Sequence, residues 1–432
     1  MKNYKFLVPV GIVLIYAASV YFMYSSRAAE SNQYNQYIAL ARDFRRQDIQ
    51  VDAEKNYEKA ISLNPSLELY LEIGEFYHET NQVKKAINWG NQILTTFPKQ
   101  KEGYEFLIGI YAERGDYVAC YKLADTLQKR DVISERVSEV IDSIKYEFYF
   151  NEEFADVGIF SAGLCPVKTE GKWGYVDNTG HKVIANKFLE VGYHSGNLAP
   201  VIDSEGEIYY IDETGNKKKV ILNIEGIQQL GLIENGVFSL YDGKTWGFYD
   251  EGEQLLFGGY DEVSSMGNGV AAVMQDDKWT LVDRGGNPLT EQRYDGVVMD
   301  EKRVVYRNER IFVFEGYDCY MIDLEGNNIG SAYQDAKVFN DGSYAAVELN
   351  NRWGFVDKEG EIKIEPCYED ARSFSNGLAA VKYAGKWGFI DIDGNMVIDS
   401  QFDDAKDFTG AGSVFVKKGD AWNLLRLYKD NH

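Results

Sequence analysis

Few residues in this chain have the type and spacing that catalysis requires. Its four histidines could each act as a base, but none lies beside a nucleophile in a recognisable motif. They are His78, His181, His194 and His432. The chain also has no glycine-rich phosphate loop, no HExxH and no GxSxG sequence. The sequence therefore predicts no catalytic residues, and a protein that is not an enzyme.

The chain offers no convincing set of metal ligands either. Four widely scattered cysteines indicate neither a disulfide framework nor a zinc site; they are Cys120, Cys165, Cys319 and Cys367. The sequence Asp391-Ile-Asp393-Gly394 begins like a calcium loop, but the remaining ligands do not follow. An aspartate-glycine turn is the better interpretation of these residues. We expect neither a metal nor a cofactor.

Charge and length limit the class of partner. The net charge is −23, from 45 basic and 68 acidic residues, which argues against nucleic acid because phosphate binding needs clustered lysine and arginine. With 432 residues, of which 45% are hydrophobic, the chain exceeds one ordinary domain.

A short phrase recurs through the second part of the chain and is clearest around Trp387. An aromatic residue marks each copy, and the copies are spaced by 37, 36, 33, 41, 33, 34 and 35 residues. These eight anchors are Trp173, Tyr210, Trp246, Trp279, Tyr320, Trp353, Trp387 and Trp422. An aspartate often follows four residues after the anchor and opens an Asp-x-x-Gly turn, as in Asp391 to Gly394. Such a fixed period, with short alternating runs between turns, predicts repeated antiparallel strands.

Three copies carry a resemblance to a known family. Lys172-Trp-Gly-Tyr-Val-Asp177, Arg352-Trp-Gly-Phe-Val-Asp357 and Lys386-Trp-Gly-Phe-Ile-Asp391 resemble the WG (KWG) repeat of bacterial proteins. The copies around Tyr210 and Tyr320 lack the Trp-Gly pair. The resemblance implies an all-β domain over residues 151–432, of a kind found in envelope-associated or multidomain proteins, and it implies no reaction.

A second recurring phrase indicates how this β domain closes. It consists of an aromatic residue or Ile, usually an acid, and then a small or β-branched residue, and it occurs eight times between Phe154 and Ala405. The region begins with such a closing phrase at Phe154-Ala-Asp-Val157 and ends with an anchor at Trp422. This offset is expected where the first strand completes the last blade of a ring. We predict a propeller-like ring of about seven or eight small blades; the alternative is an open β-solenoid.

The repeated aromatic side chains have two possible roles. An eightfold recurrence favours packing, either as a core column or as wedges between blades. The alternative is a surface on which sugar rings stack, which predicts a cell-wall glycan as the ligand.

Residues 30–150 have helical spacing with a period near 34, and they resemble tetratricopeptide (TPR) repeats. The resemblance implies that large residues on the first helix of each unit pack against the small residues Ala53, Ala86 and Cys120 on the second. Pro65 and Pro98 end two of the units. A capping helix is expected between Val132 and Phe150. The resemblance implies a partner groove, for which the candidates are Tyr37, Phe44, Tyr70, Tyr77, Tyr104 and Tyr111.

Residues 6–24 contain no charged side chain and are long enough to cross most of a bilayer. Basic residues precede this run, which predicts an N-terminal transmembrane anchor over residues 1–29. The corresponding localisation is a single-pass protein of the bacterial cytoplasmic membrane with its bulk outside. An uncleaved anchor is favoured over a signal peptide.

Together these features predict a multidomain α and all-β chain: an anchor, a TPR-like solenoid and a WG-repeat ring. The predicted function is a non-enzymatic, membrane-anchored scaffold that binds a protein or peptide through the helical groove and the β surface. Two alternatives remain: a module that binds cell-wall glycan, and a hydrolase with its site in the centre of the ring.

Overall fold

The computed structural model describes residues 7–221, 224–340 and 342–430. The chain divides into two compact units, Met1–Glu147 and Phe148–Asn431, termed here the helical unit and the β unit.

The helical unit consists of consecutive helices joined by short turns. They are α1 (Leu7–Arg46), α2 (Gln50–Leu63), α3 (Leu67–Glu79), α4 (Val83–Thr96), α5 (Lys101–Glu113), α6 (Tyr117–Lys129) and α7 (Glu135–Ser143). Pro65 and Pro98 follow the ends of α2 and α4. The side chain of Ser66 accepts a hydrogen bond from the backbone N–H of Leu69 and so caps α3.

Small residues allow these helices to pack closely. Ala41, Ala53 and Ala86 are fully buried in one core, together with Tyr57 and Phe76. Gly90 of α4 likewise allows a close approach. A Cβ atom there would lie 2.4 Å from Leu107 of α5, so Leu107 fills that space.

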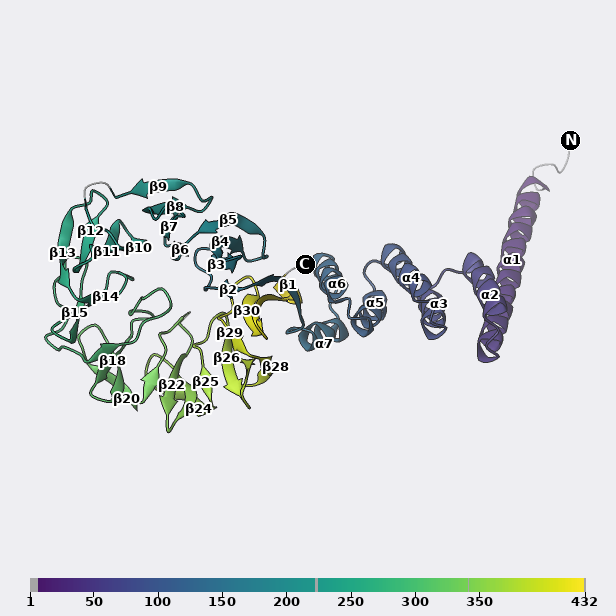
Figure 1. The fold of residues 1–432 in the computed structure, drawn as a ribbon. Coiled ribbons are helices and arrows are strands. Elements are labelled where there is room, and N and C mark those ends of the chain that lie inside the picture. The colour runs from purple at the N-terminus through teal and green to yellow at the C-terminus, as the bar shows by residue number, and fades with distance from the viewer. Residues whose placement is uncertain (1–6, 222–223, 341, 431–432) are drawn as a thin grey trace. The chain divides into compact units, whose positions relative to one another are not determined.

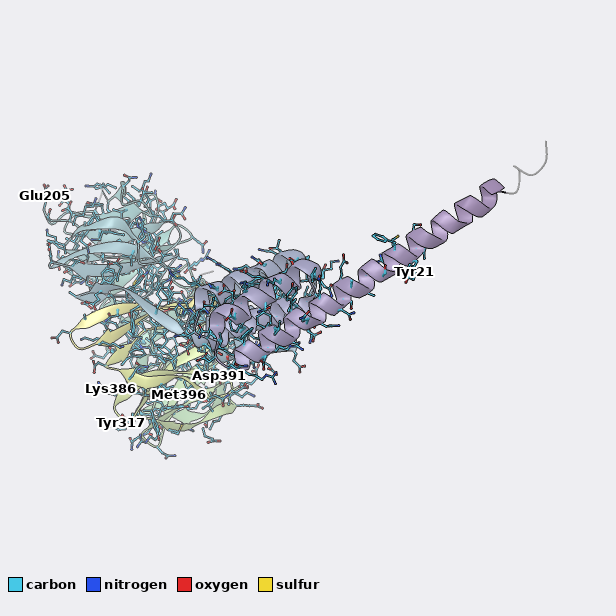
Figure 2. The ribbon with its side chains drawn as sticks, turned by 90° about the vertical axis from the view of Figure 1, so that its right-hand side faces the viewer. Tyr21, Glu205, Tyr317, Lys386, Asp391 and Met396 are labelled. Carbon is cyan, nitrogen blue, oxygen red and sulfur yellow. The ribbon has the colours of Figure 1, made fainter. Side chains whose placement is uncertain are left out.

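The predicted membrane anchor is wrong. We find no helix, among the residues that the structure describes, that is both long and apolar enough to cross a bilayer. The apolar run from residue 7 is the first part of α1, which continues through charged residues to Arg46 and contributes Ile38 and Ala41 to the helical core. Tyr21 lies on this helix with 77% of its surface exposed (Figure 2). Phe6, the first residue of the predicted span, lies outside the described residues. The predicted single-pass localisation falls with the anchor.

The β unit is an eight-bladed propeller (Figure 1). In chain order the blades are β2 (Asp156–Val157), β3 (Leu164–Thr169), β4 (Lys172–Asp177) and β5 (Lys182–Phe188); β6 (Glu190–Val191), β7 (Leu198–Ile202), β8 (Ile208–Asp212) and β9 (Lys217–Val220); β10 (Gln229–Glu234), β11 (Val237–Tyr241), β12 (Trp246–Asp250) and β13 (Leu255–Tyr260); β14 (Glu262–Val263), β15 (Ala271–Gln275) and β16 (Lys278–Val282); β17 (Gly296–Val297), β18 (Ile311–Glu315), β19 (Asp318–Ile322) and β20 (Asn328–Tyr333); β21 (Asp335–Ala336), β22 (Ala345–Leu349), β23 (Arg352–Val356) and β24 (Ile362–Tyr368); β25 (Asp370–Ala371), β26 (Leu378–Tyr383), β27 (Lys386–Asp391) and β28 (Met396–Phe402); and β29 (Asp404–Ala405), β30 (Ser413–Lys418), β31 (Ala421–Leu427) and β1 (Phe148–Phe154). A short 3₁₀ helix, η1 (Tyr428–Asp430), follows β31.

The first strand of the unit completes the last blade, as the offset of the two phrases predicts. β1 pairs antiparallel with β31, and Phe154 lies opposite Trp422 in that pairing. In continuous blades the closing aromatic lies opposite the tryptophan in the same way, as in Trp387 with Phe402. The ring is therefore closed by hydrogen bonds between the two ends of the β unit, and the solenoid alternative is excluded.

The closing phrase carries the chain from one blade to the next. Its aromatic residue ends the outer strand of a blade, and its last two residues form the short inner strand of the following blade, as in Phe402 and β29. The copy at Ile224–Ile227 differs, since the first strand of its blade, β10, begins only at Gln229.

The glycine of the Trp-Gly pair allows a close approach of two backbones. The pairing of β27 with β28 is irregular on both sides of Phe389. A Cβ atom at Gly388 would lie 2.6 Å from the carbonyl oxygen of Ile398 and 2.7 Å from the nitrogen of Ser400. Any larger residue at this position would collide with backbone, which explains why the pair recurs.

Candidate ligand-binding pocket in the centre of the β ring

The eight recurring aromatic residues of the predicted repeat lie in packed positions within the β unit. Five of them are buried and three are half-buried: Tyr210, Trp279, Trp353, Trp387 and Trp422 in the first group, and Trp173, Trp246 and Tyr320 in the second. None presents an exposed ring of the kind that stacks on sugars.

Two anchors stand at a different register from the tryptophans. In the fifth blade Cys319 lies opposite the closing Tyr333, and Tyr320 is the next residue. In the second blade Tyr210 lies opposite Pro200, as Tyr175 lies opposite Pro166 in the first. Ile208, two residues earlier, therefore occupies the tryptophan position of that blade. Cys319 and Ile208 each lie four residues before the aspartate of the turn, which is the signal that identifies them.

The predicted groove residues lie mainly within the packing of the helical unit. Tyr77 and Tyr104 are buried, and Tyr37, Phe44, Tyr70 and Tyr111 are half-buried. The Tyr77 hydroxyl donates to Glu54 at 2.8 Å, and the Tyr104 hydroxyl donates to the carbonyl of Pro98 at 3.0 Å. These phenols already have partners within the unit.

The histidines and cysteines do not gather at one site. His78 pairs with Glu113, the backbone N–H of His181 donates to Asp177, and His194 packs edge-on against Tyr175. Burial lowers the pKa of His194. Cys367 is exposed and the other three cysteines are buried. His432 lies outside the described residues. Within the described part of the chain no group of three or more potential ligands could hold a metal ion.

A pocket of about 520 Å³ lies among the inner strands of the β unit. Most of its lining comes from the short inner strands and the segments beside them, and Lys382 of β26 and Trp387 of β27 complete it. The lining residues are Ile159, Met299, Asp300, Glu301, Lys337, Val338, Asn340, Asp370, Ala371, Arg372, Ser373, Lys382, Trp387, Asp403, Asp404 and Asp407. A second pocket of about 400 Å³ shares Ile159, Asp300, Asn340 and Asp407 with it. Volumes of this size suit small ligands.

One long connection delivers Glu301 to this pocket. Between β17 and β18 the chain runs from residue 298 to 310, whereas the corresponding connection after β25 runs from 372 to 377. The extra residues produce the 41-residue interval between Trp279 and Tyr320. They form a turn in which Asp300 accepts from the backbone of Lys302 and Val304. Arg303 anchors that turn to the fourth blade by donating to Glu262 and to the carbonyl of Val263.

Glu301 connects distant blades electrostatically. Arg372 of the seventh blade donates to its Oε1 at 3.0 Å, and Lys406 of the eighth donates to its two oxygens at 2.9 and 3.0 Å. The Tyr193 hydroxyl of the second blade lies 3.4 Å from Oε2. Burial by itself raises the pKa of Glu301, but Lys406 and Arg372 outweigh it and hold this pKa below its usual value.

The cations around Glu301 stand at one repeated position. The backbone N–H groups of Lys337, Arg372 and Lys406 each donate to the equivalent carbonyl of the neighbouring strand, so the three residues correspond in successive blades. Lys337 lies over the ring of Trp353 at 4.7 Å, and Lys406 lies over Trp422 at 5.5 Å. Arg372 reaches Glu301 instead.

Two buried side-chain atoms at the pocket have no hydrogen-bond partner among the described residues, although other atoms of the same side chains do. Asp407 Oδ1 and Arg372 Nε are buried atoms without a hydrogen bond. Burial raises the pKa of Asp407 against the opposing charges of Arg372 and Lys406. A buried acceptor without a donor costs about 1–3 kcal/mol, so the unsatisfied oxygen of Asp407 lowers the stability of the fold.

We expect Glu301→Gln and Asp407→Asn to change stability in opposite directions. Loss of the Glu301 charge leaves Arg372 and Lys406 unpaired; with 31% of the side chain exposed, the free energy of unfolding falls by about 1–2 kcal/mol. This contribution is present above the ordinary glutamate pKa and is lost as pH falls through the lowered pKa.

The raised pKa of Asp407 means that its ionised form costs stability at pH 7, so Asp407→Asn raises the melting temperature. Thermal unfolding at pH 7 and pH 4 tests both; Glu309→Gln, at an exposed pair with Lys358, is the control.

Comparisons with known proteins agree with the repeat. The family model "WG containing repeat" matches residues 246–279, 321–353, 353–387 and 387–422, so the predicted resemblance is confirmed for these stretches. No curated protein matched the chain. Among solved structures, Kluyveromyces lactis Hsv2p is 9% identical over 56% of this chain and 93% of its own, with a TM-score of 0.36. A structure described as "Crystal structure of the eukaryotic initiation factor" is 11% identical over 66% of this chain and 88% of its own, with a TM-score of 0.42. Likenesses of this size say nothing about function.

Proposed function

We propose that the protein is a non-enzymatic interaction scaffold that binds a protein partner through a TPR-like helical groove and the WG-repeat ring. One observation carries the proposal: the recurring aromatic residues are used for packing, which leaves the surfaces between repeats for recognition. Repeat arrays of this kind present extended concave surfaces to partners.

The helical unit supports the TPR-like part of the proposal. The small residues Ala53, Ala86 and Cys120, which TPR packing requires on the second helix of each pair, are fully buried. The first helices of two successive pairs, α1 and α3, border a groove of about 700 Å³. Its lining is Arg42, Arg45, Arg46, Glu68, Leu71, Glu72 and Glu75.

The groove offers charges of both signs to a partner. Arg42 pairs with Glu72 at 2.7 Å, which fixes the wall between α1 and α3. Arg46 has 76% of its side chain exposed, and Glu75 is exposed on the opposite wall. Exposed charges at the rim of an interface control association and specificity more than fold stability.

A charge-swapped variant tests the proposal with net charge unchanged. The full chain, its Arg46→Glu/Glu75→Lys variant and an Arg136→Glu/Glu139→Lys control on α7 serve as baits in an extract of the source cells. Captured proteins are quantified by mass spectrometry. We expect partners that the wild-type and control baits retain and that the groove variant retains at least about tenfold less, as loss of two interface charges predicts. Equal capture by all three baits contradicts a role for the groove.

The second candidate is a hydrolase in the centre of the ring, which one observation favours. Glu301 and Asp407 border the same pocket, and their pKa values are shifted in opposite directions. Both oxygens of Glu301 are engaged by Arg372 and Lys406, however, which makes Glu301 a poor base or nucleophile. Turnover of an aryl glycoside panel by the full chain, abolished by Asp407→Asn, supports this candidate, whereas no turnover by the wild type removes it.

A further inference from the structure

We propose that the central pocket of the β unit binds a small zwitterion, a molecule with an ammonium or guanidinium group at one end and a carboxylate at the other. This activity goes beyond the scaffold function, because it requires no protein partner and uses residues of the ring alone.

Six acids border the pocket, and among them Asp407 alone has a buried carboxylate oxygen without a hydrogen-bond donor in the described part of the chain. Asp407 is the second residue after the short inner strand of the eighth blade. The corresponding residues are Ile159 in the first blade, Tyr193 in the second, Ser265 in the fourth, Met299 in the fifth, Val338 in the sixth and Ser373 in the seventh. Only the eighth of these blades places an acid there. Asp407 borders both pockets, and one of its oxygens lacks a donor among the described residues. Asn340, Arg372 and Lys406 also act on this carboxylate, and its free oxygen Oδ1 is the atom available to a ligand ammonium or guanidinium group.

Trp387 provides a second contact for the same cation. In the blades on either side, a lysine lies over the corresponding tryptophan, Lys337 over Trp353 and Lys406 over Trp422. In the seventh blade the corresponding residue, Arg372, is held by Glu301. Among the described residues no cation lies over Trp387, which borders the pocket. A ligand ammonium can take the place that the repeat gives to lysine in its neighbours.

The cationic side of the pocket is formed by Lys337 and Lys382. Both border the pocket, and within the described part of the chain neither ammonium group has an ion-pair or hydrogen-bond partner. Lys337 has only its contact with Trp353. The Nε of Arg372 is a further donor without an acceptor. These groups can receive a ligand carboxylate by charge-assisted hydrogen bonds.

The presence of both sets selects the class of ligand. A ligand with one charge would satisfy either Asp407 Oδ1 or the lysines Lys337 and Lys382, and would leave the other group without a hydrogen-bond partner in the pocket, which costs free energy. A ligand with both charges satisfies both. The pocket volume of about 520 Å³ admits a molecule between an amino acid and a short peptide in size.

A series of ω-amino acids tests the proposal, since it varies the distance between the two charges. Binding of glycine, 4-aminobutyrate and 6-aminohexanoate to the full chain is measured by titration calorimetry at pH 7, with hexylamine and hexanoate as singly charged controls. We expect at least one amino acid to bind about tenfold more tightly than either control, as a charge-assisted contact predicts. Equal binding of a control, or no binding by any amino acid at 10 mM (roughly the weakest useful affinity), overturns the proposal.

Matched variants assign the two ends of the ligand. Asp407→Asn is expected to lower the affinity for the best-binding amino acid at least about tenfold and to leave the affinity for hexanoate unchanged. Lys337→Met is expected to lower the affinity for that amino acid by a similar factor and to leave the affinity for hexylamine unchanged. Lys278→Met, which removes a lysine paired with Asp295 away from the pocket, is the control. Thermal melts establish that each variant is folded. Unchanged affinity in folded Asp407→Asn overturns the assignment and with it the proposal.

Discussion

Replacing Gly388 by alanine is expected to lower the free energy of unfolding of the β unit by about 3 kcal/mol, because the new methyl group must displace backbone. The new methyl group would meet the carbonyl oxygen of Ile398 and the nitrogen of Ser400. Both are backbone atoms, so they cannot move aside as the end of a flexible side chain can. Gly174 and Gly354 face their neighbouring strands at similar distances, so the effect should recur there.

Urea unfolding followed by tryptophan fluorescence measures this effect in the intact chain. Six of the seven tryptophans belong to the β unit, and only Trp89 belongs to the helical unit, so fluorescence reports mainly on the ring. Gly109→Ala in α5 is the control, followed by far-ultraviolet circular dichroism because it lies in the helical unit. Nothing lies within 4 Å of the added atom, and alanine is favoured in a helix by about 1 kcal/mol. A Gly388→Ala protein as stable as the wild type would refute the explanation of the Trp-Gly pair.

Shortening Phe154 to alanine is expected to cost about 3–4 kcal/mol and to loosen the ring where it closes. Phe154 is buried opposite Trp422, and its ring meets Phe415 edge-on at 5.7 Å. Removing it creates a cavity between the first strand and the hairpin that this strand completes.

The same fluorescence measurement, with limited proteolysis, tests the closure. Phe150→Ala on the same strand is the control; Phe150 is 36% exposed, so its loss should cost about 1 kcal/mol. In Phe154→Ala we expect faster cleavage near residues 148–154 than elsewhere in the ring. Cleavage spread evenly over all blades would show that β1 does not hold the ring closed.

The closed ring could be predicted from the sequence because closure leaves a trace in the order of the repeats. A closing phrase without an anchor at Phe154, and an anchor without a closing phrase at Trp422, required the two ends to pair. The structure confirms this prediction, because Phe154 and Trp422 lie opposite each other in one blade.

The register of the second and fifth blades is hard to predict from the sequence because an aromatic side chain can occupy several positions on a strand. Tyr210 and Tyr320 fit the average spacing, but strand pairing depends on the turns. Counting back four residues from Asp212 and Asp323 leads to Ile208 and Cys319. A turn aspartate, fixed by backbone hydrogen bonds, is a better register mark than a side chain that several packing positions accept.

The pocket could be anticipated only in part. The 41-residue interval before Tyr320 signals an inserted segment, and that segment carries Glu301. Its partners Arg372 and Lys406 lie 71 and 105 residues away and come together only because the blades form a ring. The membrane prediction failed because it rested on the apolar run alone. Residues 7–24 of that run belong to a 40-residue helix whose later half packs in the helical core.

The pairing of β1 with β31 also fixes an order of events during synthesis. β1 leaves the ribosome before any other strand of the ring, yet its partner is the last to be made. Until residue 427 has emerged, β1 has an unsatisfied edge, and a nascent chain is exposed to pairing with strands of other molecules. The ring can therefore be completed only after β31 has been made, and synthesis that stops before β31 gives a chain whose ring cannot close.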